Sequence, residues 1–238
     1  MTASPPLNLQ TLWIDRQQDL DTWVKHAEAA PWLGIDTEFE RVRTFFPRLC
    51  LLQMSTPQQA VCIDPLMDFD WDAVRMLLTR TRPTKIFHAA RQDLEVLHHH
   101  LSVLPSNIFD TQIAGAFCGY GEQAGYAHLV KEICSVSLPK AFTRTPWCRR
   151  PLSEEEVQYA LDDVHYLGML YETLSAELQD RGRTSWLADD CFALVSDQAL
   201  QKARRAPIGR ILRACAGMDS ASQSVAAALA KWREDLAR

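Results

Sequence analysis

Glycine is scarce in this chain, which has 9 glycines among 238 residues. Loops that cradle phosphate groups need glycine so that backbone N–H groups can approach the ligand closely. Neither the G-x-G-x-x-G pattern nor the Walker loop occurs in the sequence. Nucleotide-cofactor chemistry of these two kinds therefore has little support.

Closely spaced cysteine pairs and long apolar runs are also absent. The seven cysteines are odd in number and no two are separated by only two residues, which argues against a disulfide framework and a zinc ribbon. Scattered thiols suit a reducing cytosol. The opening MTASPPLNLQ lacks the basic and apolar regions of a secretory signal, and no apolar run approaches the ~20 residues that span a bilayer. We therefore predict a cytoplasmic protein with no membrane partner.

Positive charge is not in excess, because 25 Lys and Arg face 30 Asp and Glu for a formal charge of -5. This balance excludes a protein that binds nucleic acid through its net charge, and it leaves a local basic groove open. Hydrophobic residues make up 47% and charged residues 23%, as in a folded globular chain. The length predicts one full domain with an appendage.

The order of predicted elements indicates an α/β domain. Short apolar runs predict strands, and apolar residues at helical spacing predict helices. The predicted strands are Trp32–Glu38, Leu49–Met54, Ala60–Asp64, Lys85–His88 and Ile108–Asp110. The predicted helices are Trp71–Leu78, Ala90–Leu101, one from Thr111, and one from Ser153 to Gln179 that opens with a Ser153/Glu156 capping box. Three strands followed by strand–helix alternation are typical of a mixed β-sheet flanked by helices.

The chain after about residue 182 follows a different pattern. Residues 184–238 predict helices alone, with breaks at Pro207 and Gly217. A segment of this length buries little core by itself. We therefore predict a domain over residues 1–182 and a helical tail over residues 183–238, which either packs on the domain or belongs to something larger.

Several acids occupy positions from which they could converge. Asp36 and Glu38 end the first predicted strand on one face, with Thr37 on the other, and Asp93 opens the helix after the fourth strand. Tyr159 and Asp163 share one face of the long helix. Each feature alone also fits a solvated acid or a packing aromatic. Together they indicate a two-metal site, because two cations about 3.5–4 Å apart need carboxylates from several elements.

These residues resemble the three motifs of the DEDDy 3′→5′ exonucleases, and the match is closest to the ribonuclease D family. The matching segments run in order along the chain: Asp36-Thr-Glu38 with Leu49–Gln53, His88-x-x-x-x-Asp93, Phe109–Gly119, Arg150-Pro-Leu152, and Tyr159-x-x-x-Asp163. The resemblance covers about residues 33–182 and implies a ribonuclease H-like fold. The end of the tail, residues 226–238, looks like an early helix of an HRDC domain. Either the sequence is a piece of a longer protein that carries the rest of this domain, or a short natural variant dispenses with it.

The resemblance also implies a role for each residue. Two divalent cations, Mg²⁺ or Mn²⁺, would be held by the four acids, with Asp36 bridging both. Glu38 and Asp163 would hold the cation that activates water, and Asp93 would support the second. Tyr159 would hydrogen-bond the attacking water and orient it, since a free tyrosine, with a pKa near ~10, is a weak choice of base.

Basic and aromatic residues near the motifs suit a single-stranded 3′ end, because phosphates pair with cations and bases stack on rings. The expected nucleic-acid contacts are Thr37, Phe39, Arg43, Phe45, His88 and Lys140. The basic runs at residues 140–150 and 201–213 are further candidates, although a solvated face is the more common explanation of each run taken alone. Trp147 and Trp232 are predicted to pack rather than to stack on bases, and the His98–His100 run is predicted to lie on the surface.

Three readings of function remain open from the sequence. The first is a metal-dependent 3′→5′ exoribonuclease that trims RNA 3′ ends, tRNA precursors being the substrate class that the resemblance implies. The second is the same chemistry on single-stranded DNA or on very short oligonucleotides, because contacts to the 2′-OH are invisible in a motif. The third is a catalytically silent nucleic-acid-binding module, or a structural protein in which the acids are incidental.

Overall fold

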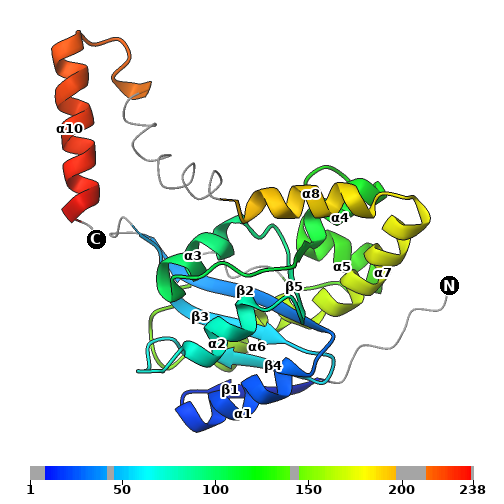
Figure 1. Cartoon of the computed structure of the whole chain (residues 1–238). Coiled ribbons are helices and arrows are strands. Elements are labelled where there is room, and N and C mark those ends of the chain that lie inside the picture. Colours follow the sequence, from blue (N-terminus) through cyan, green and yellow to red (C-terminus); the bar gives the residue numbers. More distant parts are fainter. Residues whose placement is uncertain (1–8, 42–45, 140–144, 197–212, 237–238) are drawn as a thin grey trace.

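The computed structural model describes residues 9–41, 46–139, 145–196 and 213–236. Its centre is a six-stranded sheet in the order β1-β4-β3-β2-β5-β6 (Figure 1). β3 runs antiparallel to β2 and β4, and the other neighbours pair in parallel. The strands are β1 (Gln10–Ile14), β2 (Trp32–Glu40), β3 (Arg48–Ser55), β4 (Gln59–Ile63), β5 (Thr84–Phe87) and β6 (Ile108–Asp110). The predicted mixed sheet is therefore confirmed.

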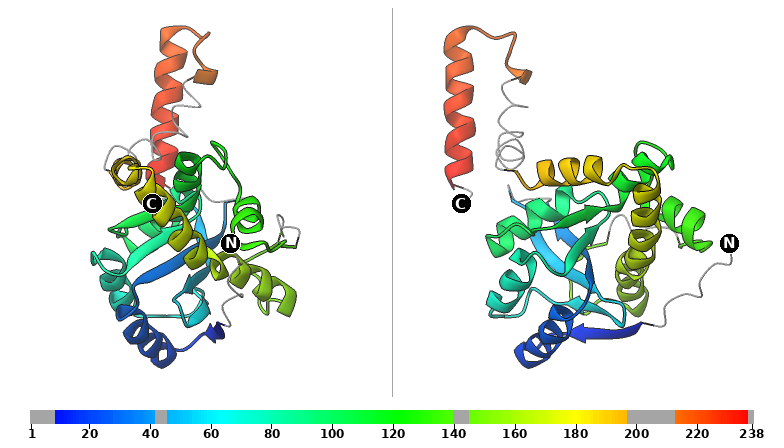
Figure 2. Two further views of the ribbon diagram at one scale, coloured as in Figure 1. Left: turned by 90° about the vertical axis from the view of Figure 1, so that its right-hand side faces the viewer. Right: turned by 45° about the vertical axis from the view of Figure 1, so that its right-hand side comes forward.

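Helices cover both faces of this sheet (Figures 1 and 2). One face carries α1 (Gln17–Glu28), α2 (Asp72–Thr79) and α3 (Arg91–Leu101). The other face carries α4 (Thr111–Cys118), α5 (Tyr126–Cys134), α6 (Glu154–His165), α7 (Leu167–Asp180) and α8 (Thr184–Leu194). Two separate buried apolar clusters fill the two interfaces, as expected for a sheet buried on both sides.

Strand β2 shows how alternation assigns side chains to the two faces. Leu33 and Ile35 belong to the core under α1, α2 and α3, whereas Trp32 belongs to the core under α6 and α7. Successive side chains of a strand point to opposite faces. Asp36 and Glu38 therefore lie on the face covered by α6, and Thr37 lies on the face covered by α3.

The long helix expected from Ser153 to Gln179 is two helices, and this part of the prediction is wrong. The capping box at Ser153 and Glu156 is present, but α6 ends at His165 and α7 begins at Leu167. Gly168 lies against Trp32, where an added Cβ would stand 2.1 Å from the indole Cζ2 atom. A glycine is required here so that the junction between α6 and α7 can approach β2 this closely.

Two elements at the start of the chain have no counterpart in the prediction. β1 pairs in parallel with β4 at the edge of the sheet, and α1 buries Leu20, Trp23, Val24 and Ala27. β1 carries polar residues at Gln10 and Thr11, so its apolar alternation is too short to be read as a strand.

The tail begins with a helix that packs on the sheet domain. α8 buries Leu187 and Cys191, and Trp186 meets Phe117 of α4 edge to face at 5.9 Å between ring centroids. α10 (Ser220–Leu236) exposes Trp232 to 61%, so the prediction that Trp232 is a packing residue is wrong for the described chain. Among the described residues, no helix combines the length and hydropathy that a bilayer crossing requires.

Two of the seven cysteines are joined, which corrects the expectation of free thiols throughout. Cys50 at the start of β3 forms a disulfide with Cys148, 98 residues later, and their Cα atoms are 4.8 Å apart. The sequence spacing carries no signal of this pair because only the fold brings the two segments together. Cys62, Cys118, Cys134, Cys191 and Cys215 are free.

Candidate active site

Three of the predicted acids meet where the end of β2 faces α6. Ligand oxygens of Asp36, Glu38 and Asp163 all lie within 4.8 Å of one another. Asp36 and Glu38 reach this point because they are two residues apart on one face of β2, and Asp163 reaches it from the last turn of α6. The convergence predicted from the sequence is therefore present for these three side chains.

Asp93 lies beside this group rather than inside it. It is buried at the start of α3, and its Oδ1 atom accepts a hydrogen bond of 2.6 Å from the Thr37 hydroxyl. Thr37, expected as a nucleic-acid contact, is itself buried on the α3 side of β2 and holds this acid in place. The charge of Asp36 still acts on Asp93, so the fourth acid belongs to the same electrostatic site.

All four acids resist ionisation in this arrangement. Burial, and then the charge of Asp163, raises the pKa of Asp36 well above its ordinary value. Burial and the neighbouring carboxylates raise the pKa of Glu38 to about 9, and burial raises the pKa of Asp163 to about 7. The pKa of Asp93 also rises, chiefly through burial and Asp36. Acids this crowded need an outside positive charge to be ionised together at neutral pH.

The donor set fits hard divalent cations. Carboxylate oxygens are the ligands that Mg²⁺ and Mn²⁺ prefer, and no described residue brings a thiolate or imidazole into the group of three acids. Gln53 supports this fit from the neighbouring strand. It pairs with Asp36 across β2 and β3, is fully buried, and its side-chain amide has no partner among the described residues. Hydrated ions at the acids would supply the partner that such an amide needs.

Tyr159 is held next to the acids from two sides. Its hydroxyl hydrogen-bonds to Asp163, one helical turn further along α6, and its ring stacks on Trp147 at 6.1 Å between centroids and 27° between planes. Burial and the nearby carboxylates raise the pKa of Tyr159, so the phenol keeps its proton at neutral pH. Trp147 is only 5% exposed, which confirms that it is a packing residue.

A pocket opens beside Tyr159 and Asp163, and its wall contains a residue that the sequence analysis missed. Tyr126 from α5 lines it together with Ala127, Leu138 and Pro139. The Tyr126 hydroxyl donates to the carbonyl of Asp162 and accepts from the N–H of Tyr166, so it fixes α5 against the end of α6. Nothing in its sequence context marks Tyr126, because its position depends on packing alone.

His88, another expected contact, lies next to Tyr126. Its Nδ1 atom is 2.9 Å from the Thr111 hydroxyl, and its ring lies 5.6 Å from that of Tyr126. Burial lowers the pKa of His88 to about 4, so the imidazole is neutral at physiological pH. A neutral, partly buried imidazole can hydrogen-bond a ligand but adds no positive charge.

The remaining nucleic-acid expectations have different outcomes. Phe39 is half-buried and packs on the core under α3. Arg43, Phe45 and Lys140 lie outside the described residues, as does most of the basic run at 201–213. Arg149 and Arg150, counted in the other basic run, form ion pairs with Glu156 and Asp64.

The His98–His100 run is less exposed than expected. Only His99 is an exposed residue, and its ring stacks on Phe46 at 4.5 Å. His98 and His100 are partly buried, and His100 meets Trp71 edge to face.

A partly buried group of carboxylates on a mixed sheet of this order, with a tyrosine hydrogen-bonded to one of them, is the arrangement of a ribonuclease H-like, metal-dependent nuclease domain. The family model described as 3′-5′ exonuclease matches residues 11–179. The chain therefore belongs to the 3′-5′ exonuclease family.

Within that family the chain is similar to proteins named ribonuclease D. It is 41% identical over 191 residues to ribonuclease D of Jannaschia sp., which covers 78% of this chain and 50% of the relative. The crystal structure of Escherichia coli RNase D is 32% identical with a TM-score of 0.85, over 97% of this chain and 61% of that one. A structure of Brucella melitensis NrnC bound to pGG is 27% identical with a TM-score of 0.68, over 83% of this chain and 95% of that one.

Proposed function

We propose that this protein is a metal-dependent 3′→5′ exoribonuclease that removes nucleotides from single-stranded RNA 3′ ends. The observation that carries the proposal is the meeting of Asp36, Glu38 and Asp163 within 4.8 Å, with the Tyr159 hydroxyl hydrogen-bonded to Asp163. The resemblance of the chain to proteins named ribonuclease D supports RNA as substrate, with tRNA precursors as the class to test. Such RNA is intracellular, which agrees with a cytoplasmic protein.

The four acids would hold two divalent cations, Mg²⁺ or Mn²⁺. Asp36, Glu38 and Asp163 form one ligand group, and the second oxygen of Asp93 remains for a second ion because Thr37 occupies the first. Bound cations of this kind polarise a phosphodiester and make water a better nucleophile.

The chain's own residues would supply orientation and water exclusion. Tyr159 keeps its proton, so it can position a water or a phosphate oxygen without acting as a base. Asp163 accepts the hydrogen bond of Tyr159 and thereby fixes the hydroxyl relative to the acids. The pocket walls of Tyr126 and Leu138 offer an apolar surface of a size suited to a nucleobase or ribose.

A direct test follows the shortening of a 5′-labelled single-stranded RNA with Mn²⁺, Mg²⁺ or EDTA. We expect a ladder that loses one nucleotide at a time from the 3′ end, and no ladder with EDTA. The same cations should raise the thermal midpoint of the protein, since a ligand that binds only the native state stabilises it. RNA binding without cleavage, and with no effect of metal on the midpoint, would instead identify a silent binding module.

A second candidate function is the hydrolysis of very short oligonucleotides. The observation that favours it is the similarity to Brucella melitensis NrnC, whose structure is described with pGG bound. Rates on a dinucleotide and on a longer RNA, measured at equal concentration, separate the two candidates. A faster rate on the dinucleotide would select the second.

A further inference from the structure

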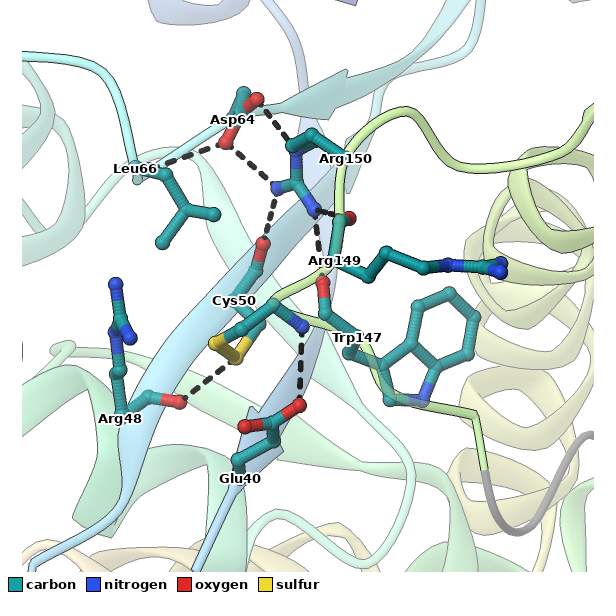
Figure 3. A network of polar contacts seen from close by, with 9 residues as sticks. Glu40, Arg48, Cys50, Asp64, Leu66, Trp147, Arg149 and Arg150 are labelled. Carbon is teal, nitrogen blue, oxygen red and sulfur yellow. Dashed lines mark hydrogen bonds and ion pairs between the residues drawn. A yellow bond between two sulfur atoms is a disulfide. The ribbon is translucent and has the colours of Figure 1, made fainter.

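Residues 147–150 form a short segment, called the strap below, that connects the two elements carrying the acids. β2 supplies Asp36 and Glu38, and α6 supplies Tyr159 and Asp163. The strap lies against the end of β2 and the start of β3, where Cys148 meets Cys50 and Glu40 (Figure 3), and its Trp147 stacks on Tyr159 of α6. Its position therefore bears on the distance between the two halves of the site.

On the sheet side, the strap is tied to β2 and β3. Cys148 forms the disulfide with Cys50 of β3, and its backbone N–H donates to Glu40 Oε1 of β2 at 3.2 Å. Arg150 donates to the carbonyl of Cys50 at 2.6 Å and makes two contacts of 2.6 Å to the carboxylate of Asp64. One covalent tie and several polar ties thus meet at the start of β3 (Figure 3).

On the helix side, the strap is tied to α6. Arg149 Nη2 donates to both carboxylate oxygens of Glu156 at 2.8 and 2.9 Å, and Glu156 is the residue that closes the capping box of α6. Trp147 stacks on Tyr159, and its carbonyl accepts from Arg150 at 2.8 Å. Movement of the strap would therefore be transmitted directly to the ring of Tyr159.

We propose that Cys50 and Cys148 form a redox site whose closed, disulfide form sets a higher turnover by fixing the strap under Tyr159. This inference rests on the proposed nuclease function for its effect on turnover. The molecules that would address the site are low-molecular-weight thiols and disulfides of the glutathione class.

Cys50 and Cys148 differ in exposure, and this difference decides which of the two sulfur atoms an incoming thiolate can attack. Cys50 is completely buried, whereas Cys148 is partly exposed. An incoming thiolate attacks the Cys148 sulfur, forms a mixed disulfide there and releases the Cys50 thiolate, which takes a proton. A second thiol then attacks the mixed disulfide, so two small thiols become one small disulfide while Cys50 and Cys148 gain two electrons and two protons. Oxidation runs through the same steps in reverse.

The polar contacts of Arg150 limit how far the strap can move, and therefore how much kcat falls, when the disulfide is reduced. In the reduced protein, Arg150 still holds Asp64 and the Cys50 carbonyl, so the strap stays near its place. Reduction should therefore shift the rings of Trp147 and Tyr159 only slightly. Misplacement of a catalytic group by a fraction of an ångström lowers the rate moderately. We expect kcat to fall about three- to tenfold on reduction while KM changes less than about twofold.

The experiment compares two forms of the wild-type chain. One is oxidised with oxidised glutathione and the other reduced with tris(2-carboxyethyl)phosphine, and both are desalted before assay. Alkylation and mass spectrometry should find Cys50 and Cys148 blocked only in the oxidised form. Hydrogen exchange of peptides over residues 145–163 should be slower in that form, its thermal midpoint should be higher by several degrees, and it should show the higher kcat on labelled RNA.

Single variants separate this site from the other thiols. Cys148→Ser should have the kcat of the reduced form and should no longer respond to glutathione or phosphine. Cys215→Ser, which removes a free cysteine outside the strap, should keep the full response.

Two results would overturn the inference. The first is equal hydrogen exchange and equal midpoints for the two forms, whatever the hydrolysis rates are. The second is a redox response that survives in Cys148→Ser. If exchange and midpoint respond but neither form cleaves RNA, the proposed nuclease function fails and the claim on turnover fails with it, while the redox-controlled strap stands.

Discussion

Two groups of carboxylates lie close to the strap, and only one of them is paired with a cationic side chain. Asp64 is almost fully buried and faces the guanidinium of Arg150, which makes two contacts of 2.6 Å to it. Asp36, Glu38 and Asp163 face one another, and the pKa of each is raised. A buried carboxylate paired with arginine completes a structure, whereas carboxylates that crowd without a cation prepare a site for one. Asp64 is therefore a structural residue, whereas Asp36, Glu38 and Asp163 are candidates for binding a cation.

The largest effect should come from removing an acid of the crowded group. We expect Asp36→Ala to lower kcat at least about a thousandfold, because the residue would touch both ions. The thermal midpoint without metal should stay equal or rise, since a repulsive neighbour is gone. Steady-state hydrolysis and calorimetry measure the two effects.

Asp180→Ala is the matched control for this variant, since Asp180 is an exposed acid at the end of α7 that belongs neither to the group of three acids nor to the pocket lining. It should keep turnover within about twofold of the wild type, because exposed substitutions away from a site change little. An Asp36→Ala protein that cleaves RNA at the native rate would refute the metal site.

The paired group should respond in the opposite way. Asp64→Ala leaves Arg150 without its carboxylate, and we expect the free energy of unfolding to fall by about 3–5 kcal/mol. The double variant Asp64→Leu/Arg150→Met should recover much of this loss, because it removes both charges. Urea unfolding of the wild type, Asp64→Leu, Arg150→Met and the double variant forms a double-mutant cycle. A double variant less stable than Asp64→Ala would show that the pair contributes more than mutual neutralisation.

Lys85 is a buried basic residue without a carboxylate partner among the described residues, and it should make the stability of the protein depend on pH. Lys85 is fully buried in β5, its ammonium donates to the carbonyl of Arg80, and burial lowers its pKa from 10.5 to about 8. Between these two values the unfolded chain binds a proton that the native chain lacks. Stability should therefore rise as pH increases from about 8 to 10.5, by at most about 3 kcal/mol.

Lys85→Met should remove that part of the pH dependence, while Lys131→Met on the exposed side of α5 should leave it unchanged. Chemical unfolding at several pH values measures both variants. A wild-type stability that falls across this window would contradict the assignment to Lys85.

The smallest effect should come from removing a single hydroxyl at the site. Tyr159→Phe keeps the stack on Trp147 and loses the bond to Asp163, so we expect kcat to fall about 10- to 100-fold with little change in RNA affinity. Single-turnover rates and binding in Ca²⁺ separate the two quantities. Tyr171→Phe, whose ring packs on Phe109, is the matched control. A large loss of affinity in Tyr159→Phe would make the tyrosine a binding residue.

The sequence predicted much of this site because local periodicity places its residues. Two residues along a strand bring Asp36 and Glu38 to one face, and four along a helix bring Tyr159 and Asp163 together. The sequence could not show that Thr37 hydrogen-bonds to Asp93, because this bond depends on where α3 lies. It also missed Tyr126 and the Cys50–Cys148 bond, which depend on contacts between distant segments.

The same limit applies to the fold, where local apolar patterns predict elements and contacts between distant segments are not visible. Strands with strong apolar runs were found, whereas the edge strand β1 was not, since it is partly polar. The break between α6 and α7 is not visible in the sequence because an apolar helical pattern continues through it. The contact between Gly168 and Trp32 shows how closely the chain approaches β2 just after this break.

The disulfide closes a covalent ring, so the chain has a stretch before the ring, the ring itself and a stretch after it. Asp36 and Glu38 precede the ring that Cys50 and Cys148 close, Asp93 lies within it, and Asp163 follows it. A protease that cuts once inside the ring therefore releases no fragment from the oxidised protein, and all four acids remain in one molecule. In the reduced protein the same cut separates Asp36 from Asp163. Gel mobility with and without reductant after a single cut would read out that connectivity directly.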